Sequence, residues 1–375
     1  MSNKELSRLE LIQKLIERRL TQTEVAEILK ISTRQVQRLI KSYRSSGANG
    51  LVSKKRGKPS NNVISGGDKT KVLAIITEYY SDFGPTLAAE KLLQRHNYGF
   101  SVETVRKWMI ESALWIPREQ KLKRAHQPRY RRNCLGELVQ IDGSYHDWFE
   151  GRAPKCCLLV FIDDATSKIM QLYFTTSESM HTYFLATKAY VTKHGRPLAF
   201  YSDKLGVFRV AHKEAAEQGA ITQFGRALQE LDIQLICANT CQAKGRVERA
   251  NKTLQDRLVK ELRLKNISSI AEANVYLNEF TRDHNAKFAK APLNSTNMHR
   301  ILSPHMILNG ILCFQTTRTV SHNLTFQHNR QLFLLEDNTQ TRALRRKQIT
   351  LCEYPEGLCR IWLKPILKTD TLTVG

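Results

Sequence analysis

The stretch 138–264 alternates short apolar runs with helical patterns, and this order constrains the fold most. Strand-like runs occupy 138–142, 156–163, 168–175, 198–202 and 233–237. Helical periodicity occupies 180–193, 224–231 and the long basic stretch 244–264. The order βββαβαβα predicts an α/β core in which helices cover a mixed sheet.

Three acidic residues stand where this pattern can bring them together. Asp142 ends the first apolar run, Asp203 ends the fourth, and Glu248 lies early in the long helix. Carboxylates from two strand ends and a following helix can meet at one edge of a sheet, where they would hold two divalent cations about 3.5–4 Å apart. Mg²⁺ suits such oxygen ligands. Each residue alone is typical of a cap, but three in this order within a basic chain favour a metal site that attacks phosphodiesters.

The residues around these carboxylates resemble an integrase-type transposase core. The matching blocks are VQIDG (139–143), FIDDAT (161–166), YSD (201–203) and AKGRVERAN (243–251). Over roughly residues 5–350 the chain resembles the ISNCY group of bacterial insertion-sequence transposases, within the DDE transposase and retroviral-integrase superfamily. The resemblance implies an RNase H-like fold, two Mg²⁺ (or Mn²⁺) ions per active site, and DNA strand cleavage and strand transfer. By motif match, Asp142, Asp203 and Glu248 take the catalytic, metal-binding positions.

The spacing departs from the family pattern in one place. Asp203 and Glu248 are separated by 44 residues, more than is usual, and an insertion around 207–219 would explain the extra length. Asp163 and Asp164 are rival metal ligands, but their place before a turn favours a structural, capping role. His146 and Asp147 follow Asp142 closely, and the sequence does not decide whether they support the site.

The long helix also carries candidate DNA contacts. Asn251, Lys252 and Gln255 share a face with Glu248, because they lie three, four and seven residues further on. The candidate contacts of this region are Lys244, Arg246, Arg249 and Lys252. A surface helix with mixed charges is the alternative interpretation.

Charge indicates the class of partner. The 375 residues carry a net charge of +23, and residues 1–133 hold 27 Lys and Arg against 12 Asp and Glu. This excess predicts a polyanion such as double-stranded DNA as the partner. An apolar run of about 18 residues and a signal peptide are both missing, so we expect a soluble, cytoplasmic, nucleoid-associated protein without a membrane partner. The eight cysteines fit no zinc pattern, which favours buried reduced thiols.

Residues 5–45 predict three helices and a helix-turn-helix. The segments TQTE (21–24) and STRQ (32–35) both fit a capping box at a helix start. The second of these helices would offer Thr33 and four longer side chains to DNA, namely Arg34, Gln37, Arg38 and Lys41. An ordinary helical hairpin with a solvated charged face is the alternative.

A second helix-turn-helix is predicted further along. Helical periodicity occupies about 69–80, 86–95 and 102–114, and Glu103, Thr104, Arg106 and Lys107 lie near its reading surface. A packing unit without DNA contacts is the alternative. Two basic linkers flank this region, and the second holds seven Lys and Arg against one acid in 118–132, which favours contact with the DNA backbone.

The expected domains follow from these patterns. They are a helix-turn-helix domain (1–46), a flexible basic linker (47–67), a second helix-turn-helix-like domain (68–116), a basic linker (117–133), the RNase H-like core (134–285) and a small β-rich C-terminal region (286–375). Residues 366–375 show no clear pattern, so a truncated C-terminus is one interpretation.

Three functions compete for this chain. The first is a DDE transposase that binds the terminal repeats of its element and target DNA as a homo-multimer. The second is a DNA-binding regulator or decayed transposase with an inactive core. The third, an RNase H-type ribonuclease, fits poorly with two modules that read double-helical DNA. The intact set of three carboxylates favours the first.

Overall fold

The computed structural model forms two compact units, Met1–Leu122 and Lys123–Gly375. It describes residues 2–54, 57, 64–117, 130–203, 207–208, 221–237, 245–354, 359–362 and 372–373. Apart from residues 207 and 208, the insertion expected around 207–219 lies outside the described residues.

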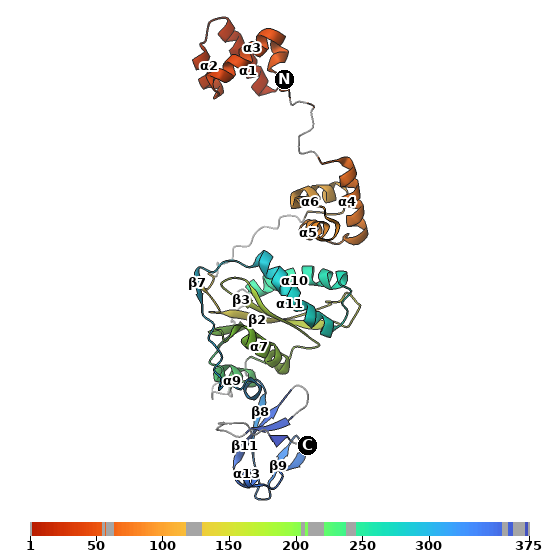
Figure 1. The fold of residues 1–375 in the computed structure, drawn as a ribbon, viewed down its shortest axis with the longest axis vertical. Helices are drawn as coiled ribbons and strands as arrows, with labels where there is room; N and C mark the ends of the chain where they lie inside the picture. Colours follow the sequence, from red (N-terminus) through yellow and green to blue (C-terminus); the bar gives the residue numbers. More distant parts are fainter. Residues whose placement is uncertain are drawn as a thin grey trace. The chain divides into compact units, whose positions relative to one another are not determined.

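Three helices around a small apolar core begin the first unit. They are α1 (Asn3–Ile16), α2 (Gln22–Leu29) and α3 (Thr33–Ser46) (Figure 1). At the start of α2 the Glu24 amide donates to the Thr21 hydroxyl at 3.3 Å, and the Thr21 amide donates to the Glu24 carboxylate at 2.7 Å. This is the predicted capping box. Lys30 then turns the chain into α3 from the left-handed region, with φ of 54°, so the predicted helix-turn-helix is present.

The linker expected from residue 47 starts later than predicted. Gly47–Leu51 forms a 3₁₀ helix, η1, and Leu51 is buried in the same core as Ile12 and Val36. The Ser42 hydroxyl donates to the carbonyl oxygen of Gly50 at 2.7 Å. A Cβ on Gly50 would lie 2.1 Å from the Ser42 carbonyl oxygen. The small residues that suggested flexibility therefore permit a close turn onto α3.

A second group of three helices follows in the same unit. It consists of α4 (Gly66–Tyr79), α5 (Pro85–His96) and α6 (Val102–Glu111). Ser65 and Ser101 cap α4 and α6 through their hydroxyls, and Pro85 occupies the first turn of α5, where its missing amide costs nothing. Asn97 ends α5 in the left-handed region. These helices agree with the periodicity of the sequence.

A five-stranded mixed sheet forms the centre of the second unit. Its strands are β2 (Val139–His146), β3 (Cys156–Asp163), β4 (Ile169–Thr175), β5 (Ala199–Ser202) and β6 (Gln234–Cys237). The spatial order is β4-β3-β2-β5-β6, in which the first three strands are antiparallel and β5 and β6 run parallel to β2. The predicted βββαβαβα order and the RNase H-like fold class are confirmed.

Helices cover both faces of this sheet. On one face, α7 (Met180–His194) and α9 (Gln223–Glu230) share an apolar core with Leu159 and Phe161 of β3. On the other face, α10 (Gly245–Leu264) and α11 (Ile270–Phe288) pack with Leu158 and Val160 (Figure 1). Successive residues of β3 thus enter opposite cores, which explains why this strand reads as an unbroken apolar run.

The C-terminal part is rich in strands, as predicted. Its elements are β7 (Asn294–Asn297), α12 (Leu308–Ile311), β8 (Phe314–Thr319), β9 (Thr325–His328), β10 (Gln331–Leu334), α13 (Thr339–Arg342), β11 (Gln348–Glu353), β12 (Cys359–Trp362) and β13 (Leu372–Thr373). Strand β7 pairs with β1 (Cys134–Leu135). The others form a sheet of order β13-β12-β11-β8 and the hairpin β9–β10. Although residues 366–375 show no clear sequence pattern, strand β13 lies within this segment and pairs with β12.

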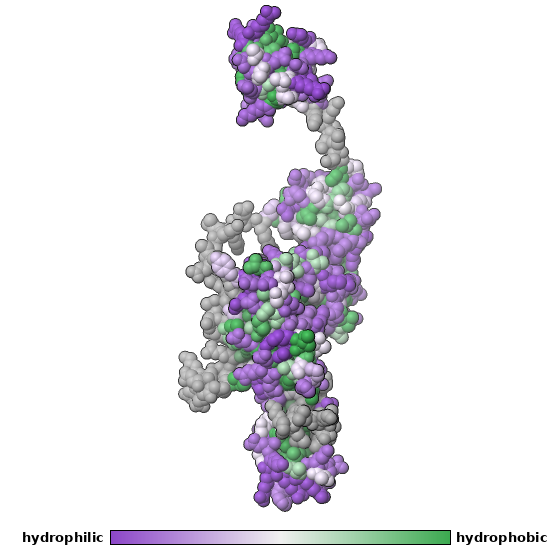
Figure 2. Space-filling view, turned by 60° about the vertical axis from the view of Figure 1, so that its left-hand side comes forward, coloured by the Kyte–Doolittle hydropathy of each residue, from purple (hydrophilic) through white to green (hydrophobic). Residues whose placement is uncertain are grey.

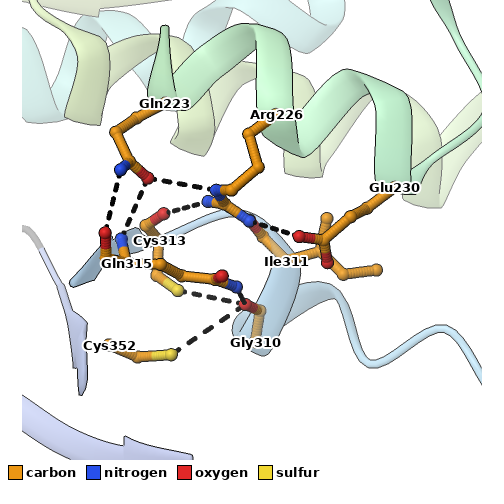
Figure 3. Close-up of polar contacts among 8 residues, drawn as sticks. All are labelled: Gln223, Arg226, Glu230, Gly310, Ile311, Cys313, Gln315 and Cys352. Carbon is orange, nitrogen blue, oxygen red and sulfur yellow. Dashed lines mark hydrogen bonds and ion pairs between the residues drawn. The ribbon is translucent and has the colours of Figure 1, made fainter. Parts of the chain in front are cut away.

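Side chains of α9 hold the start of this C-terminal sheet (Figure 3). Arg226 donates to the carbonyl oxygens of Ile311 and Cys313 at 3.0 and 2.6 Å. Gln223 both donates to and accepts from the backbone of Gln315, at 2.8 and 3.0 Å. Cys313 is a buried free thiol, as are Cys156, Cys157 and Cys352, in agreement with the expectation for these cysteines.

On the face drawn in Figure 2, hydrophilic residues dominate and apolar residues occur in small separate patches. Among the described residues, no helix has the length and apolar character needed to cross a membrane.

Candidate active site

Asp142 and Asp203 lie at matching levels of neighbouring strands. Strands β2 and β5 pair in parallel, with Val139 opposite Phe200 and Gln140 opposite Tyr201. Continuing this register by two residues places Asp142 level with Asp203. Strand β5 ends at this level, whereas β2 continues into its hairpin with β3. Both side chains are half-buried. Two of the three predicted carboxylates therefore come from adjacent strands at one level of the sheet.

Helix α10 packs along β2 and forms three hydrogen bonds with it, at intervals of one helical turn. The Val247 amide donates to Gln140 Oε1 at 3.1 Å. One turn further on, Asn251 Nδ2 donates to Asp142 Oδ2 at 2.8 Å. After another turn, Gln255 Nε2 donates to the Ser144 hydroxyl at 3.1 Å.

The spacing of these contacts has a simple geometric cause. Four helical residues rise about 6 Å, and two strand residues span about 6.6 Å, so each turn of α10 meets the next residue on one face of β2. Glu248 follows Val247 directly and is exposed. The first of the three contacts therefore fixes the turn that carries Glu248.

The three predicted carboxylates have the oxygen atoms that suit a divalent cation, but the structure does not gather them into a metal site. Among the described residues, no group of three or more His, Cys, Asp or Glu side chains is arranged to hold a metal ion. Asp142, Asp203 and Glu248 offer only oxygen ligands, which Mg²⁺ prefers. Beside Asp142, the Asn251 Oδ1 atom is buried and has no hydrogen-bond partner among the described residues. Such an orphaned acceptor suits a site that gains a cation or a donor when loaded.

The rival carboxylate Asp163 serves a turn, as the sequence suggested. Its Oδ1 accepts from the amide and hydroxyl of Thr166 at 2.8 and 2.7 Å, and its Oδ2 accepts from the Gly136 amide at 2.9 Å. Burial raises the pKa of Asp163 above its ordinary value. Asp147 likewise accepts from the Gly151 amide at 3.1 Å within the hairpin, while His146 packs edge-on against Trp148.

Arg246 pairs with a buried acid. Its Nη1 lies 2.6 Å from Asp164 Oδ1, and the two side chains are 12% and 0% exposed. Arg249 and Lys252 are exposed on α10, whereas the candidate contact Lys244 lies outside the described residues. Of the basic side chains predicted in this region, Arg249 and Lys252 have the accessibility that a DNA contact requires.

The candidate DNA-reading residues are on the surface of the first unit. Arg34, Gln37, Arg38 and Lys41 are exposed on α3, as is Thr33. On α6, Arg106 and Lys107 are exposed and Thr104 is half-buried, and Arg106 lies 3.4 Å from the exposed Glu103. Buried Val36 and Val105 lie on the opposite faces of these helices.

Two further groups border the site without having been singled out from the sequence. Gln140 is fully buried and joins β2 to α10. In the sequence, Gln140 could have been recognised because it is a polar residue inside an apolar run, two positions before Asp142. Glu178 accepts from the Tyr183 hydroxyl at 2.5 Å, and its carboxylate occupies the space where a Cβ of Gly143 would lie. Burial raises the pKa of Tyr183 well above its ordinary value, and the charges of Glu178 and Asp142 raise it further.

Comparisons with known sequences find relatives along most of the chain. A family model described as a helix-turn-helix domain matches residues 7–60, and one described as a homeodomain-like domain matches residues 35–109. The chain is 49% identical over 359 residues to the "Putative transposase y4bF" of Sinorhizobium fredii, which covers 95% of this chain and 78% of the relative. It is 28% identical over 296 residues to the transposase for insertion sequence IS1202 of Streptococcus pneumoniae, covering 69% of this chain and 63% of that relative.

Solved structures of lower similarity include two viral proteins. The HTLV-2 integrase catalytic core domain in complex with magnesium is 18% identical, with a TM-score of 0.31, and covers 42% of this chain and 91% of that chain. The simian T-cell lymphotropic virus intasome in complex with the PP2A regulatory subunit B56 gamma is 13% identical, with a TM-score of 0.36, and covers 81% of this chain and 95% of that chain.

Proposed function

Because the chain belongs to the transposase family that includes y4bF, we propose that it cleaves and joins DNA through Asp142, Asp203 and Glu248. The observation that supports this most is the match between α10 and β2. Their contacts hold the turn that bears Glu248 against the strand that bears Asp142. The register of β2 and β5 supports Asp203 as the third member.

The three carboxylates would hold divalent cations, Mg²⁺ or Mn²⁺, two per active site. When bound, two such ions stabilise the charge on the attacking and leaving oxygens of an in-line displacement at phosphorus. The all-oxygen donor set and the unpartnered Asn251 Oδ1 support this proposal.

The residues of this chain would orient the reactants in two steps. In the first, water attacks the phosphodiester at the end of the element, one P–O bond breaks, and a 3′-hydroxyl leaves. In the second, that hydroxyl attacks a target phosphodiester and replaces its 3′-oxygen, so the number of P–O bonds is conserved. Asn251 holds the Asp142 carboxylate in one orientation, and exposed Arg249 and Lys252 bind the phosphates beside it.

Recognition of the element's ends would fall to the two helical groups. The exposed polar faces of α3 and α6 carry the side-chain types that contact base edges and phosphates. We further propose that the chain acts as a homo-multimer on double-stranded DNA in the bacterial cytoplasm. The proposed domains keep the boundaries expected from the sequence, except that η1 extends the first domain to residue 51.

Cleavage of a labelled duplex tests this function. The duplex carries one end of the element and its flank, and the full chain is incubated with Mg²⁺, Mn²⁺ or EDTA. We expect a metal-dependent nick at the junction that Asp142→Asn, Asp203→Asn and Glu248→Gln each abolish. Asp283→Asn is the matched control, because it neutralises an exposed acid on α11 and is expected to cleave as the unmodified chain does.

The regulator hypothesis gives a different result in the same experiment. A regulator binds the end duplex tightly, and neither the unmodified chain nor any variant nicks it in any metal. That outcome would refute the proposed chemistry while leaving the DNA-binding assignment intact.

A further inference from the structure

A buried polar relay joins the first turn of α10 to the sheet. Gln140 is 0% exposed, and its side-chain amide is used at both ends. Its Oε1 accepts from the Val247 amide at 3.1 Å, and its Nε2 donates to Asp164 Oδ1 at 2.7 Å. Arg246 donates to the same Asp164 oxygen at 2.6 Å. Two consecutive residues of α10 are therefore held by two side chains of the sheet region.

Asp164 gives the relay a fixed base. Its own amide donates to the Leu138 carbonyl oxygen at 2.9 Å, and its Oδ2 accepts from the Arg132 amide at 2.9 Å. The carboxylate is 0% exposed. Arg132, Gln140 and Arg246 all donate to it, and each is more than 20 positions away from Asp164 in the chain. Because this carboxylate is fixed from several sides and accepts from Gln140 Nε2, it orients the side-chain amide of Gln140. The side-chain oxygen Oε1 therefore faces the helix and not the solvent.

We propose that Gln140, oriented by Asp164, is a positioning residue for Glu248. The inference rests on the proposed function, because Glu248 matters only if it acts at the site. Glu248 is exposed and follows Val247 directly, so its backbone position depends on where the first turn of α10 is held. Gln140 lies two residues before Asp142 on the same face of β2. Among the contacts that hold α10 against the sheet, the one from Gln140 to the Val247 amide lies next to Glu248 in the chain. The relay therefore holds the backbone of the turn that carries Glu248 relative to the strand that carries Asp142.

The side chain at position 140 must meet two opposite demands. It must accept from a backbone amide and donate to a carboxylate, and both partners must lie at the reach of a glutamine. Asparagine is one methylene shorter, and leucine or methionine can do neither. Loss of the relay leaves the Val247 amide without this acceptor and frees the first turn to fray, since a helix start has no internal partners for its amides.

The test combines hydrogen exchange with single-turnover cleavage in the full chain. The variant is Gln140→Met, which keeps the shape and removes both hydrogen bonds. Asp163→Asn is the matched control, because Asp163 is equally buried and close by but serves the turn with Gly136 and Thr166. Exchange in peptides covering Gly245–Leu264 is measured without metal or DNA, and cleavage is measured at saturating end duplex.

For Gln140→Met we expect amide exchange in the first turn of α10 to become on the order of 10-fold faster. The cleavage rate should fall about 10- to 100-fold, as when a residue behind a metal ligand is lost, while affinity for the end duplex changes less than about 2-fold because the reading helices are untouched. Asp163→Asn should leave exchange in that turn unchanged.

Two results overturn the inference. One is unchanged exchange in the first turn of Gln140→Met. The other is an equal increase in Asp163→Asn, which would mean that any loss of core stability frees the turn. Exchange requires neither metal nor cleavage, so the positioning role can stand or fall separately from the chemistry. If Glu248→Gln cleaves as the unmodified chain does, the proposed function fails, whatever the exchange shows.

Discussion

The Glu178 carboxylate fills the space beside Gly143, so a methyl group at position 143 should destabilise the sheet. A Cβ at this position would lie 2.5 Å from both the carboxylate carbon and Oε2 of Glu178. Real side chains do not approach so closely, so Gly143→Ala must displace the carboxylate. That carboxylate accepts from the hydroxyl of Tyr183, which is 0% exposed. The displacement is therefore expected to break a partly buried hydrogen bond to a charged group.

The cost follows from the hydrogen bond and not from the methyl group. A hydrogen bond to a charged group contributes about 1.5–3 kcal/mol, and a buried donor left without its partner costs about 1–3 kcal/mol. Because half-buried Glu178 can recover water when displaced, we expect Gly143→Ala to lower the free energy of unfolding by about 2–3 kcal/mol. In a Tyr183→Phe background this hydrogen bond is already missing, so the same change should cost at least about 1 kcal/mol less.

Thiol labelling in urea gives the readout for the sheet. Cys156 and Cys157 are each 1% exposed in β3, so their peptide is labelled only when this core opens. The labelling midpoint is compared for the unmodified chain, both single variants and the double variant. If Gly143→Ala has the same cost in both backgrounds, within about 0.5 kcal/mol, the cost does not come from the hydrogen bond between Tyr183 and Glu178, contrary to the prediction.

Three further predictions concern other parts of the molecule. Arg246→Met removes the guanidinium that pairs with buried Asp164 and should lower the free energy of unfolding by about 3–5 kcal/mol, read from the same labelling midpoint. A loss below about 1 kcal/mol would show that the pair behaves as a surface ion pair. Burial lowers the pKa of His284 to about 4 from 6.5, so the unfolded chain binds this proton first as the pH falls. The contribution of neutral His284 to stability is therefore fully present above about pH 6.5 and is lost as the pH falls toward 4. His284→Phe should therefore reduce the drop in thermal midpoint between pH 7.5 and 5, and an unchanged drop would contradict this assignment. Arg38→Ala should weaken binding to the end duplex, and if Arg38 contacts a phosphate the slope of log affinity against log salt should decrease by about 1; unchanged affinity would remove α3 from the DNA-reading surface.

The sequence predicts those parts of the fold that local patterns encode. Apolar runs and helical periodicity give the strands and helices of the core, since each periodicity reports one buried face. The capping box at Thr21 gives the start of α2, because both of its partners lie within four residues. The level shared by Asp142 and Asp203 follows from two parallel strands of the same sheet.

Contacts between distant segments could not be predicted in this way. The amide of Val247 meets Gln140 across 107 positions, and nothing local to either residue encodes that pairing. Arg246 reads as a DNA contact from its charge alone, yet its side chain is 12% exposed and paired with Asp164. Glu178 stands in a polar turn with no pattern that indicates its place beside Gly143. The 3₁₀ helix Gly47–Leu51 has the small residues of a linker in the sequence, because glycine suits both flexibility and close approach.

The proposed chemistry requires Asp142, Asp203 and Glu248 to bind the same cations. Counting Mn²⁺ bound by the full chain with its end duplex, by electron paramagnetic resonance, tests it most directly. We predict two ions per active site in the unmodified chain, and loss of at least one in each of Asp142→Asn, Asp203→Asn and Glu248→Gln. An unchanged number of bound ions, with unchanged affinity, in any of the three variants would show that the substituted carboxylate does not bind these cations.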